Sequence, residues 1–213
     1  DNNALGSFAL LANTWGYANS DVGNAALTSN TTGSNNTAVG YSAGIYNITE
    51  NCNVAVGFYA GPNSSNLSNT IAIGCNVSAS ASNSVVLGGA TMTIVGGSVN
   101  WSVTSDGRFK TNVQENVPGI EFIKKLRPVT YNYDLHTYDK WRNFDESTAA
   151  ECYAAGRKEK EAITYTGFIA QEVEKVAEEL NYDFSGVAKP ENDQTPYALR
   201  YAEFVVPLVK AGH

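Results

Sequence analysis

The sequence predicts an all-β solenoid in the first half of the chain and an α+β domain in the second half. Glycines recur every 17 residues through most of the first half, which is typical of a repeat protein. Lys, Arg and His are absent from residues 1–104, whereas all 14 Lys and Arg residues come after Ser105. Beyond that serine, segments with strand and helix patterns are mixed, which is typical of an α+β domain.

The repeat is marked by six glycines that follow short apolar segments. Ala38-Val39 and Ala55-Val56 predict short strands, and the glycine after each permits a turn with positive φ. Asn, Ser and Thr fill the expected corners, where their side chains bond the local backbone. The glycines, at spacings of 17, 17, 17, 17 and 14 residues, are Gly6, Gly23, Gly40, Gly57, Gly74 and Gly88.

Each repeat contains few apolar side chains. A turn has one or two aliphatic residues and an aromatic one, such as Tyr41 or Phe58. One chain can bury little surface with this inventory. We therefore expect several copies to pack around a common axis.

Aromatic residues in this half leave two interpretations open. They could stack on the sugar rings of a host-surface glycan, or they could pack between the chains of an oligomer. The residues concerned are Trp15, Tyr17, Tyr46 and Tyr59.

Two of the repeat units carry a resemblance to a known kind of repeat. "NTAVGYSAG" (36–44) and "NVAVGFYAG" (53–61) resemble the head repeats of trimeric autotransporter adhesins, which form a left-handed parallel β-roll. Similar repeats occur in phage tail fibres. The resemblance spans residues 1–90 and implies a trimeric β-roll. The usual unit of that family is nearer 14 residues, so the 17-residue turns imply longer corner loops.

The elements after residue 90 are predicted from alternation, helical spacing and proline positions. In the junction at 91–104, "TMTIV" and "VNWSV" predict strands. A charged stretch at 139–160 predicts an inserted loop or short helix. Further strands are predicted within 129–135 and 162–170, and helices within 117–128, 169–180 and 197–212, the last with a kink or restart at Pro207.

Four motifs in the second half occur in the order of a known domain: "TSDGRFKTNV", "IEFIKKLRPVTYNYD", "YTGFIAQEVEKV" and "YALRYAEFVVPLVKA". They resemble the intramolecular chaperone domain of endosialidases and phage tail fibres over about residues 102–211. That family is a self-cleaving peptidase, and the module also occurs in membrane-bound transcription factors of the myelin regulatory factor class. The resemblance implies homotrimeric assembly, assistance to folding of the upstream fibre, and autocleavage at the junction.

The resemblance also implies the site residues. The family's catalytic serine opens an S-D-x-R-x-K motif, which places the nucleophile at Ser105 and the base at Lys110, and the cleaved bond at Thr104–Ser105. The expected domains are then a β-roll at 1–90, a β junction at 91–104 and a chaperone domain at 105–213.

A serine–lysine pair makes chemical demands that spacing alone does not meet. A hydroxyl is a weak nucleophile and requires an adjacent base. A lysine amine has a pKa of about 10.4 in water, and it acts as a base near neutral pH only where burial lowers that pKa. Five residues separate Ser105 from Lys110, so the chain has to bend between them, and Gly107 is placed to permit the bend.

The two charged residues of the motif leave their roles open. Arg108 could hold Asp106, or donate to the oxyanion that forms at the Thr104 carbonyl. Asp106 could equally serve as a turn former. The whole motif could also be an ordinary turn between two strands.

The function that these resemblances imply is the C-terminal part of a trimeric viral tail fibre or adhesin-like spike, found on a virion or an extracellular appendage. Its chaperone domain would act once on its own chain as a serine endopeptidase. The alternative is a non-cleaving fibre tip that binds a host glycan or protein receptor. A conventional glycan hydrolase would require paired carboxylates in a cleft, and the first half contains only Asp1, Asp21 and Glu50.

Charge and composition disfavour other classes. A net charge of -7 disfavours a nucleic-acid partner, and no run of about 18 apolar residues predicts insertion into a membrane. Cys52, Cys75 and Cys152 lack metal-ligand spacing, so we expect free buried thiols, or as a minor alternative an inter-chain disulfide. No cofactor or metal is predicted. The chain opens within the repeat pattern, and we expect it to be a piece of a longer protein.

Overall fold

The computed structural model describes residues 1–142, 144 and 151–212, and only the backbone of Glu151 and Cys152. Within these residues no helix combines the length and the hydrophobicity needed to cross a bilayer. The chain divides into two compact units, and one internal segment of the second half belongs to the first unit. The first unit is Asp1–Val95 with Asp134–Ala162, and the second is Gly96–Tyr133 with Ile163–His213.

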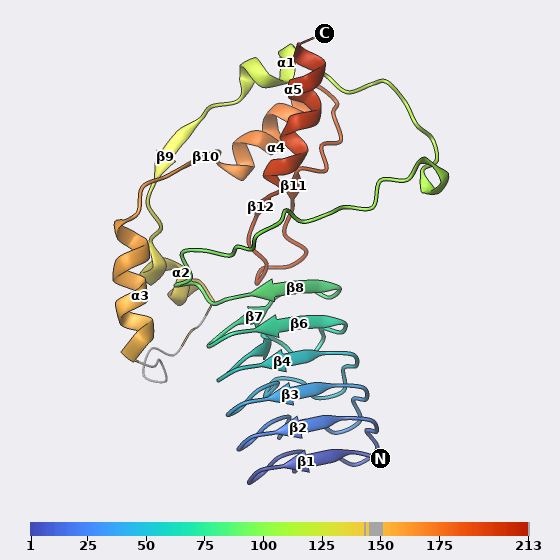
Figure 1. Cartoon of the computed structure of the whole chain (residues 1–213), viewed down its shortest axis with the longest axis vertical. Helices are drawn as coiled ribbons and strands as arrows, with labels where there is room; N and C mark the ends of the chain where they lie inside the picture. The colour runs from blue at the N-terminus through green and yellow to red at the C-terminus, as the bar shows by residue number, and fades with distance from the viewer. Residues whose placement is uncertain (143, 145–150, 213) are drawn as a thin grey trace. The chain divides into compact units, whose positions relative to one another are not determined.

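The first unit contains a parallel six-stranded sheet that takes one strand from each turn of a solenoid (Figure 1). Neighbouring strands pair at the repeat spacing, so that Leu5 lies opposite Val22 and Val22 opposite Val39. The predicted solenoid is therefore confirmed. Its strands are β1 (Asn3–Leu5), β2 (Ser20–Val22), β3 (Thr37–Val39), β4 (Val54–Val56), β6 (Thr70–Ile73) and β8 (Ser84–Leu87), with a second parallel pair, β5 (Gly61–Pro62) and β7 (Ser78–Ala79).

The repeat glycines make the turn after each strand. All six have positive φ, from 81° to 144°, as the sequence predicts. A second constraint comes from the neighbouring turn, because a Cβ on Gly23 would lie 2.4 Å from the carbonyl oxygen of Gly40. Glycine is therefore required both by the backbone conformation and by the close stacking of the turns.

Asparagine side chains form a hydrogen-bonded ladder inside the solenoid. The Oδ1 of Asn19 accepts from the backbone N–H of Asn36 at 2.9 Å, and its Nδ2 donates to the Gly33 carbonyl at 2.8 Å. Asn36 makes the same pair of bonds one turn on, to Asn53 and Glu50. The three asparagines are 1–2% exposed. Both bonds of Asn19 and of Asn36 reach the next turn, to residues 14 and 17 positions further along the chain, so the ladder ties the turns together.

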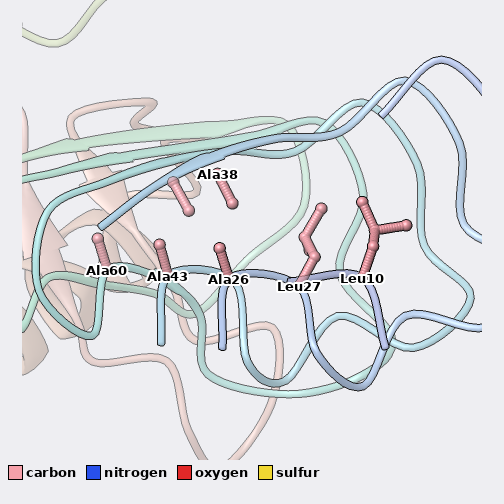
Figure 2. Close-up of a cluster of buried hydrophobic side chains, with 7 residues drawn as sticks. Leu10, Ala26, Leu27, Ala38, Ala43 and Ala60 are labelled. Atoms are coloured by element: carbon pink, nitrogen blue, oxygen red, sulfur yellow. The ribbon is translucent and has the colours of Figure 1, made fainter. Parts of the chain in front are cut away.

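The apolar core of the solenoid consists mainly of alanine. Figure 2 shows Ala26, Ala43 and Ala60 in one row along the stack, with Leu10 and Leu27 beside it. Small side chains let the two walls of the flattened coil approach each other. The core is correspondingly thin and buries little apolar area per turn.

Larger apolar side chains lie on the outer face of the sheet. They occupy the last position of each strand, directly before the repeat glycine, and point away from the alanine core. In a single chain these side chains remain partly exposed to solvent. The exposed fractions of the five most exposed ones range from 38% to 70%. These exposed residues are Leu5, Val22, Val39, Ile73 and Leu87.

One carboxyl group breaks the apolar pattern of the interior. Asp21 occupies the inward strand position that Ala4 and Ala38 occupy in the neighbouring turns. Its side chain is 1% exposed, and neither carboxylate oxygen has a hydrogen-bond partner among the described residues. Burial raises the pKa of Asp21 to about 7, from an ordinary value of 3.8.

The second unit is the α+β domain that the sequence predicts. Its core packs Phe122 and Val173 against Phe184 and Val187. The elements are η1 (Gly107–Phe109), α1 (Ile120–Lys125), β9 (Val129–Tyr131), β10 (Tyr165–Gly167), α4 (Ala170–Glu179), β11 (Val187–Ala188), β12 (Ala198–Leu199), η3 (Tyr201–Phe204) and α5 (Val205–Ala211), where η denotes a 3-10 helix. The strands pair antiparallel as β9 with β10 and β11 with β12.

Two helices overlap the stretch predicted as an inserted loop or short helix, and they belong to the first unit. They are α2 (Leu135–Trp141) and α3 (Glu151–Ala162). The strand predicted over 129–135 ends at Tyr131, because the Asp134 side chain accepts from the Thr137 N–H and caps α2.

The strands predicted in the junction are wrong. Residues 91–103 contain no strand, and Trp101 and Val103 are 84% and 86% exposed. A strand is stable only when a neighbour satisfies its backbone groups, and among the described residues no strand lies beside this segment. The alternating pattern is therefore present without a partner in one chain.

Two smaller expectations are also corrected. The helix predicted from residue 197 begins only at Val205, and Pro207 then lies in its first turn, where a missing N–H is tolerated. Cys52 is exposed and Cys75 is partly exposed, so neither is the buried thiol expected, and the described residues contain no disulfide between them. The side chain of Cys152 lies outside the described residues.

Asp21 makes the stability of the solenoid depend on pH. The unfolded carboxyl ionises near pH 3.8 and the folded one near pH 7, so stability is lost as pH rises between these values, by about 1.4 kcal/mol per pH unit. We expect Asp21→Ala to be more stable than wild type, with a gap in melting temperature that widens from pH 4 to pH 7. The exposed Glu115→Gln is the control, and a gap that does not change with pH would contradict this account.

The asparagine ladder should be as sensitive as an apolar core. Asn36→Ala leaves the Asn53 N–H without its partner and the Glu50 carbonyl with only the Asn47 amide, which should cost roughly 1–3 kcal/mol. Denaturant unfolding measures the loss. The exposed Asn24→Ala serves as the control and should change stability little, so equal losses in both variants would refute the ladder's role.

Candidate functional site

The serine and the lysine singled out by the motif lie next to each other. The Nζ of Lys110 donates to the Oγ of Ser105 at 2.7 Å. The two side chains come from opposite ends of a short bend, so the five-residue separation is bridged by local structure alone. This distance is short enough for direct proton transfer between the two groups.

The bend is a capped 3-10 turn, η1. The Asp106 carboxylate accepts from the Arg108 N–H at 2.9 Å, and the Lys110 N–H donates to the Gly107 carbonyl at 3.2 Å. Gly107 does not have the positive φ of the repeat glycines, and a Cβ there would meet nothing within 4 Å. The bend therefore depends on the Asp106 cap, and not on the conformational freedom of glycine.

Arg108 is engaged by the same aspartate. Its guanidinium binds the Asp106 carboxylate through Nε and Nη2, with an Nη2–Oδ2 distance of 2.6 Å. This side-chain hydrogen bond, together with the backbone N–H, lowers the pKa of Asp106, so the carboxylate stays ionised and the cap persists at neutral pH. Within one chain the arginine thus holds the turn.

The site lies open to solvent in a single chain. Thr104, Ser105 and Lys110 are all exposed. Water stabilises the charged ammonium form of a lysine. Low-polarity surroundings favour the neutral amine, and the exposed site of a single chain does not provide them. No cluster of three His, Cys, Asp or Glu residues that could hold a metal ion occurs in the part of the chain that the structure describes.

A second cluster of polar groups was missed in the sequence. Asp139 is 1% exposed and binds Arg142 at 2.8 Å and Arg157 at 2.6 Å. The Tyr153 hydroxyl donates to the same carboxylate at 2.7 Å. The richness of this segment in charge and alanine predicts only an inserted loop or short helix. Only the three-residue spacing of Asp139 and Arg142 indicated a helical pair.

Comparisons with known proteins single out one segment. The family model described as "Chaperone of endosialidase" (Peptidase_S74) matches residues 105–182. The match begins at Ser105 and includes Lys110. A search of curated proteins and a search of solved structures each found no match. Residues 105–182, downstream of the β-solenoid, are therefore similar to the endosialidase chaperone family.

Proposed function

We propose that this chain is the C-terminal part of a trimeric tail fibre or adhesin-like spike that processes itself. Residues 105–213 assist the folding of the upstream solenoid and then cut the Thr104–Ser105 bond. One observation carries the proposal: the Lys110 amine lies 2.7 Å from the hydroxyl of Ser105, the residue at which the family match starts.

The proposed reaction needs only these two side chains and water. A neutral Lys110 amine takes the proton of the Ser105 hydroxyl, and the Oγ attacks the Thr104 carbonyl carbon. The C–N bond breaks as the lysine returns its proton to the departing nitrogen, which leaves an ester on Oγ and a free amine on Ser105. Water then hydrolyses the ester, giving a carboxylate at Thr104 and restoring the serine hydroxyl.

Three copies of the chain supply the missing surroundings in this proposal. The site is exposed in one chain, and so is an apolar face of α5, where Val205, Val206, Leu208 and Val209 are 55–57% exposed. Packing of such faces on other copies removes apolar surface from water. Closure of the trimer would also desolvate Lys110 and favour its neutral form, so that cutting follows assembly.

Cutting after assembly makes folding kinetically one-way. Stacked parallel strands depend on contacts between residues far apart in sequence, which form slowly and expose apolar edges on the way. A chaperone that leaves after assembly lowers the barrier to folding without lowering the barrier to unfolding of the mature fibre.

The proposed location is a virion tail fibre or another extracellular appendage. There the solenoid could contact a glycan or protein receptor through exposed aromatic side chains, of which Trp15 is the most exposed at 84%.

A non-cleaving chaperone tip is the second candidate. The solvent exposure of Ser105 and Lys110 favours it, because in one chain the pair lacks the low-polarity surroundings that catalysis by a lysine base requires.

Substitution of the pair separates the two candidates. Wild-type protein should give two bands of similar mass on a denaturing gel, whereas Ser105→Ala and Lys110→Arg should each give one. Lys110→Arg keeps the positive charge but cannot become neutral near pH 7, so it tests the base and not the charge. The exposed Lys124→Arg is the matched control. A single full-length wild-type band in aged protein would exclude self-cleavage.

Assembly and cutting should fail together. Val209→Glu places a charge on the exposed face of α5, where the side chain is 56% exposed in the single chain, and it opposes burial against another copy. Sedimentation should show loss of a threefold assembly, and the gel should show at least tenfold less cleavage. Lys210→Glu, an exposed change on the same helix, should leave both intact. Full cleavage in a monomeric Val209→Glu protein would contradict the coupling.

A further inference from the structure

We infer that cutting the chain and separating its two pieces are different steps, because a helical arm from beyond the cut holds the last solenoid turn. The arm is residues 134–162, which contain α2 and α3 and form one compact unit with the solenoid. The inference rests on the proposed function for the cut itself. It adds that the helical arm controls when the fibre separates from the chaperone domain.

The arm contacts the end of the solenoid at three points. The Lys160 amine donates to the Met92 carbonyl at 2.9 Å, and Arg142 donates to the Asn76 carbonyl at 3.4 Å. Between them α3 lies directly on the chain, since a Cβ built on Gly156 would lie 2.9 Å from the Thr91 Cβ. Glycine at that position permits the close approach of the helix.

A buried ion cluster fixes the shape of the arm. Asp139 on α2 binds Arg142 on one side and Arg157 of α3 on the other, so one carboxylate joins the two helices. The Arg142 guanidinium also lies 4.1 Å from the centre of the Phe144 ring and donates to the Tyr153 hydroxyl at 2.7 Å. Removal of one member leaves an uncompensated buried charge, which is strongly destabilising. Arg142 thus belongs both to the cluster and to the contact with the solenoid.

The order of these residues along the chain determines whether the cut affects the contacts of the arm. Asn76, Thr91 and Met92 precede the Thr104–Ser105 bond, whereas Arg142, Gly156 and Lys160 follow it. Hydrolysis of that bond removes none of the contacts between the two groups. The products should therefore stay together as a complex until the arm opens.

An engineered cut tests retention independently of self-cleavage. A recognition sequence for a site-specific protease is inserted after Gly97 in Ser105→Ala protein, and the cut protein is run on a sizing column under native conditions. The two pieces should co-elute. Arg142→Ala should raise the fraction of separated pieces at least tenfold. Arg127→Ala, which removes an exposed pair with Glu172, should leave that fraction unchanged. Separation in the parent, or co-elution that survives Arg142→Ala, would overturn the inference.

A cysteine pair tests the contact even if Arg142→Ala fails to fold. With Cys52, Cys75 and Cys152 replaced by Ser, Thr91→Cys and Gly156→Cys should form a disulfide on mild oxidation that holds the cut pieces together on a non-reducing denaturing gel. The bond requires α3 to move outward by about 1 Å, from a Cβ–Cβ separation of 2.9 Å into the range of about 3.5–4.5 Å found in disulfides. Ala154→Cys, exposed on the same helix, replaces Gly156→Cys in the control and should not cross-link. Absence of the bond, or bonds only between different copies, would overturn the placement of the arm within one chain. If wild-type protein never cuts itself, the proposed function fails while both experiments still report on the arm.

Discussion

A single chain leaves much of its large apolar surface in water, and the other features of the structure follow from this constraint. The interior of the solenoid is lined mainly by alanine, with Leu10 and Leu27 beside it, so the walls lie close together and leave little room for other large side chains. Leu5 and Val22 therefore lie on the outer face, and Trp101 and Val103 extend from a junction without a neighbouring strand. Val209 on α5 is likewise exposed to solvent. Surfaces of one kind in all three regions favour a partner that repeats along the whole chain, which another copy of that chain provides.

Within the solenoid, buried hydrogen bonds hold the turns together where a larger apolar core is lacking. Asn19 satisfies two backbone groups of the next turn, the Asn36 N–H and the Gly33 carbonyl, so the register of the stack is fixed by buried polar contacts. Asp21 lacks such contacts and has no base to pair with in a half without Lys, Arg or His. The interior therefore accommodates the Asn19 amide directly before β2, whereas it disfavours an ionised carboxylate at Asp21, two residues further on.

The features that local chemistry decides could be predicted from the sequence. The spacing of Gly23 and Gly40 gave the period of the solenoid, the position and conformation of its turns and, through the strands before them, its parallel sheet. Periodicity likewise located α4, with Val173 and Ala177 buried. The junction was predicted wrongly because alternation in Trp101 and Val103 indicates a face to be covered and does not say that the cover lies in the same chain. Burial of Asp139 was missed because its partner Arg157 is 18 residues away.

The candidate site divides in the same way. Ser105 and Lys110 were identified through a resemblance, and the turn that joins them is built by Asp106 and Arg108 from within six residues. The surroundings that would make the lysine a base are not local, since the pair is exposed in one chain. Neither the motif nor the turn can supply a dry environment. The chemistry proposed here therefore depends on assembly.

Native mass spectrometry of freshly folded protein, followed over time, tests this dependence most directly, because it reads the number of copies and the state of the 104/105 bond in the same particle. The account predicts that single copies stay uncut and that cut bonds appear only in particles of three copies, which on denaturation yield pieces ending at Thr104 and beginning at Ser105. Cut single copies, or threefold particles that keep every bond intact, would contradict it.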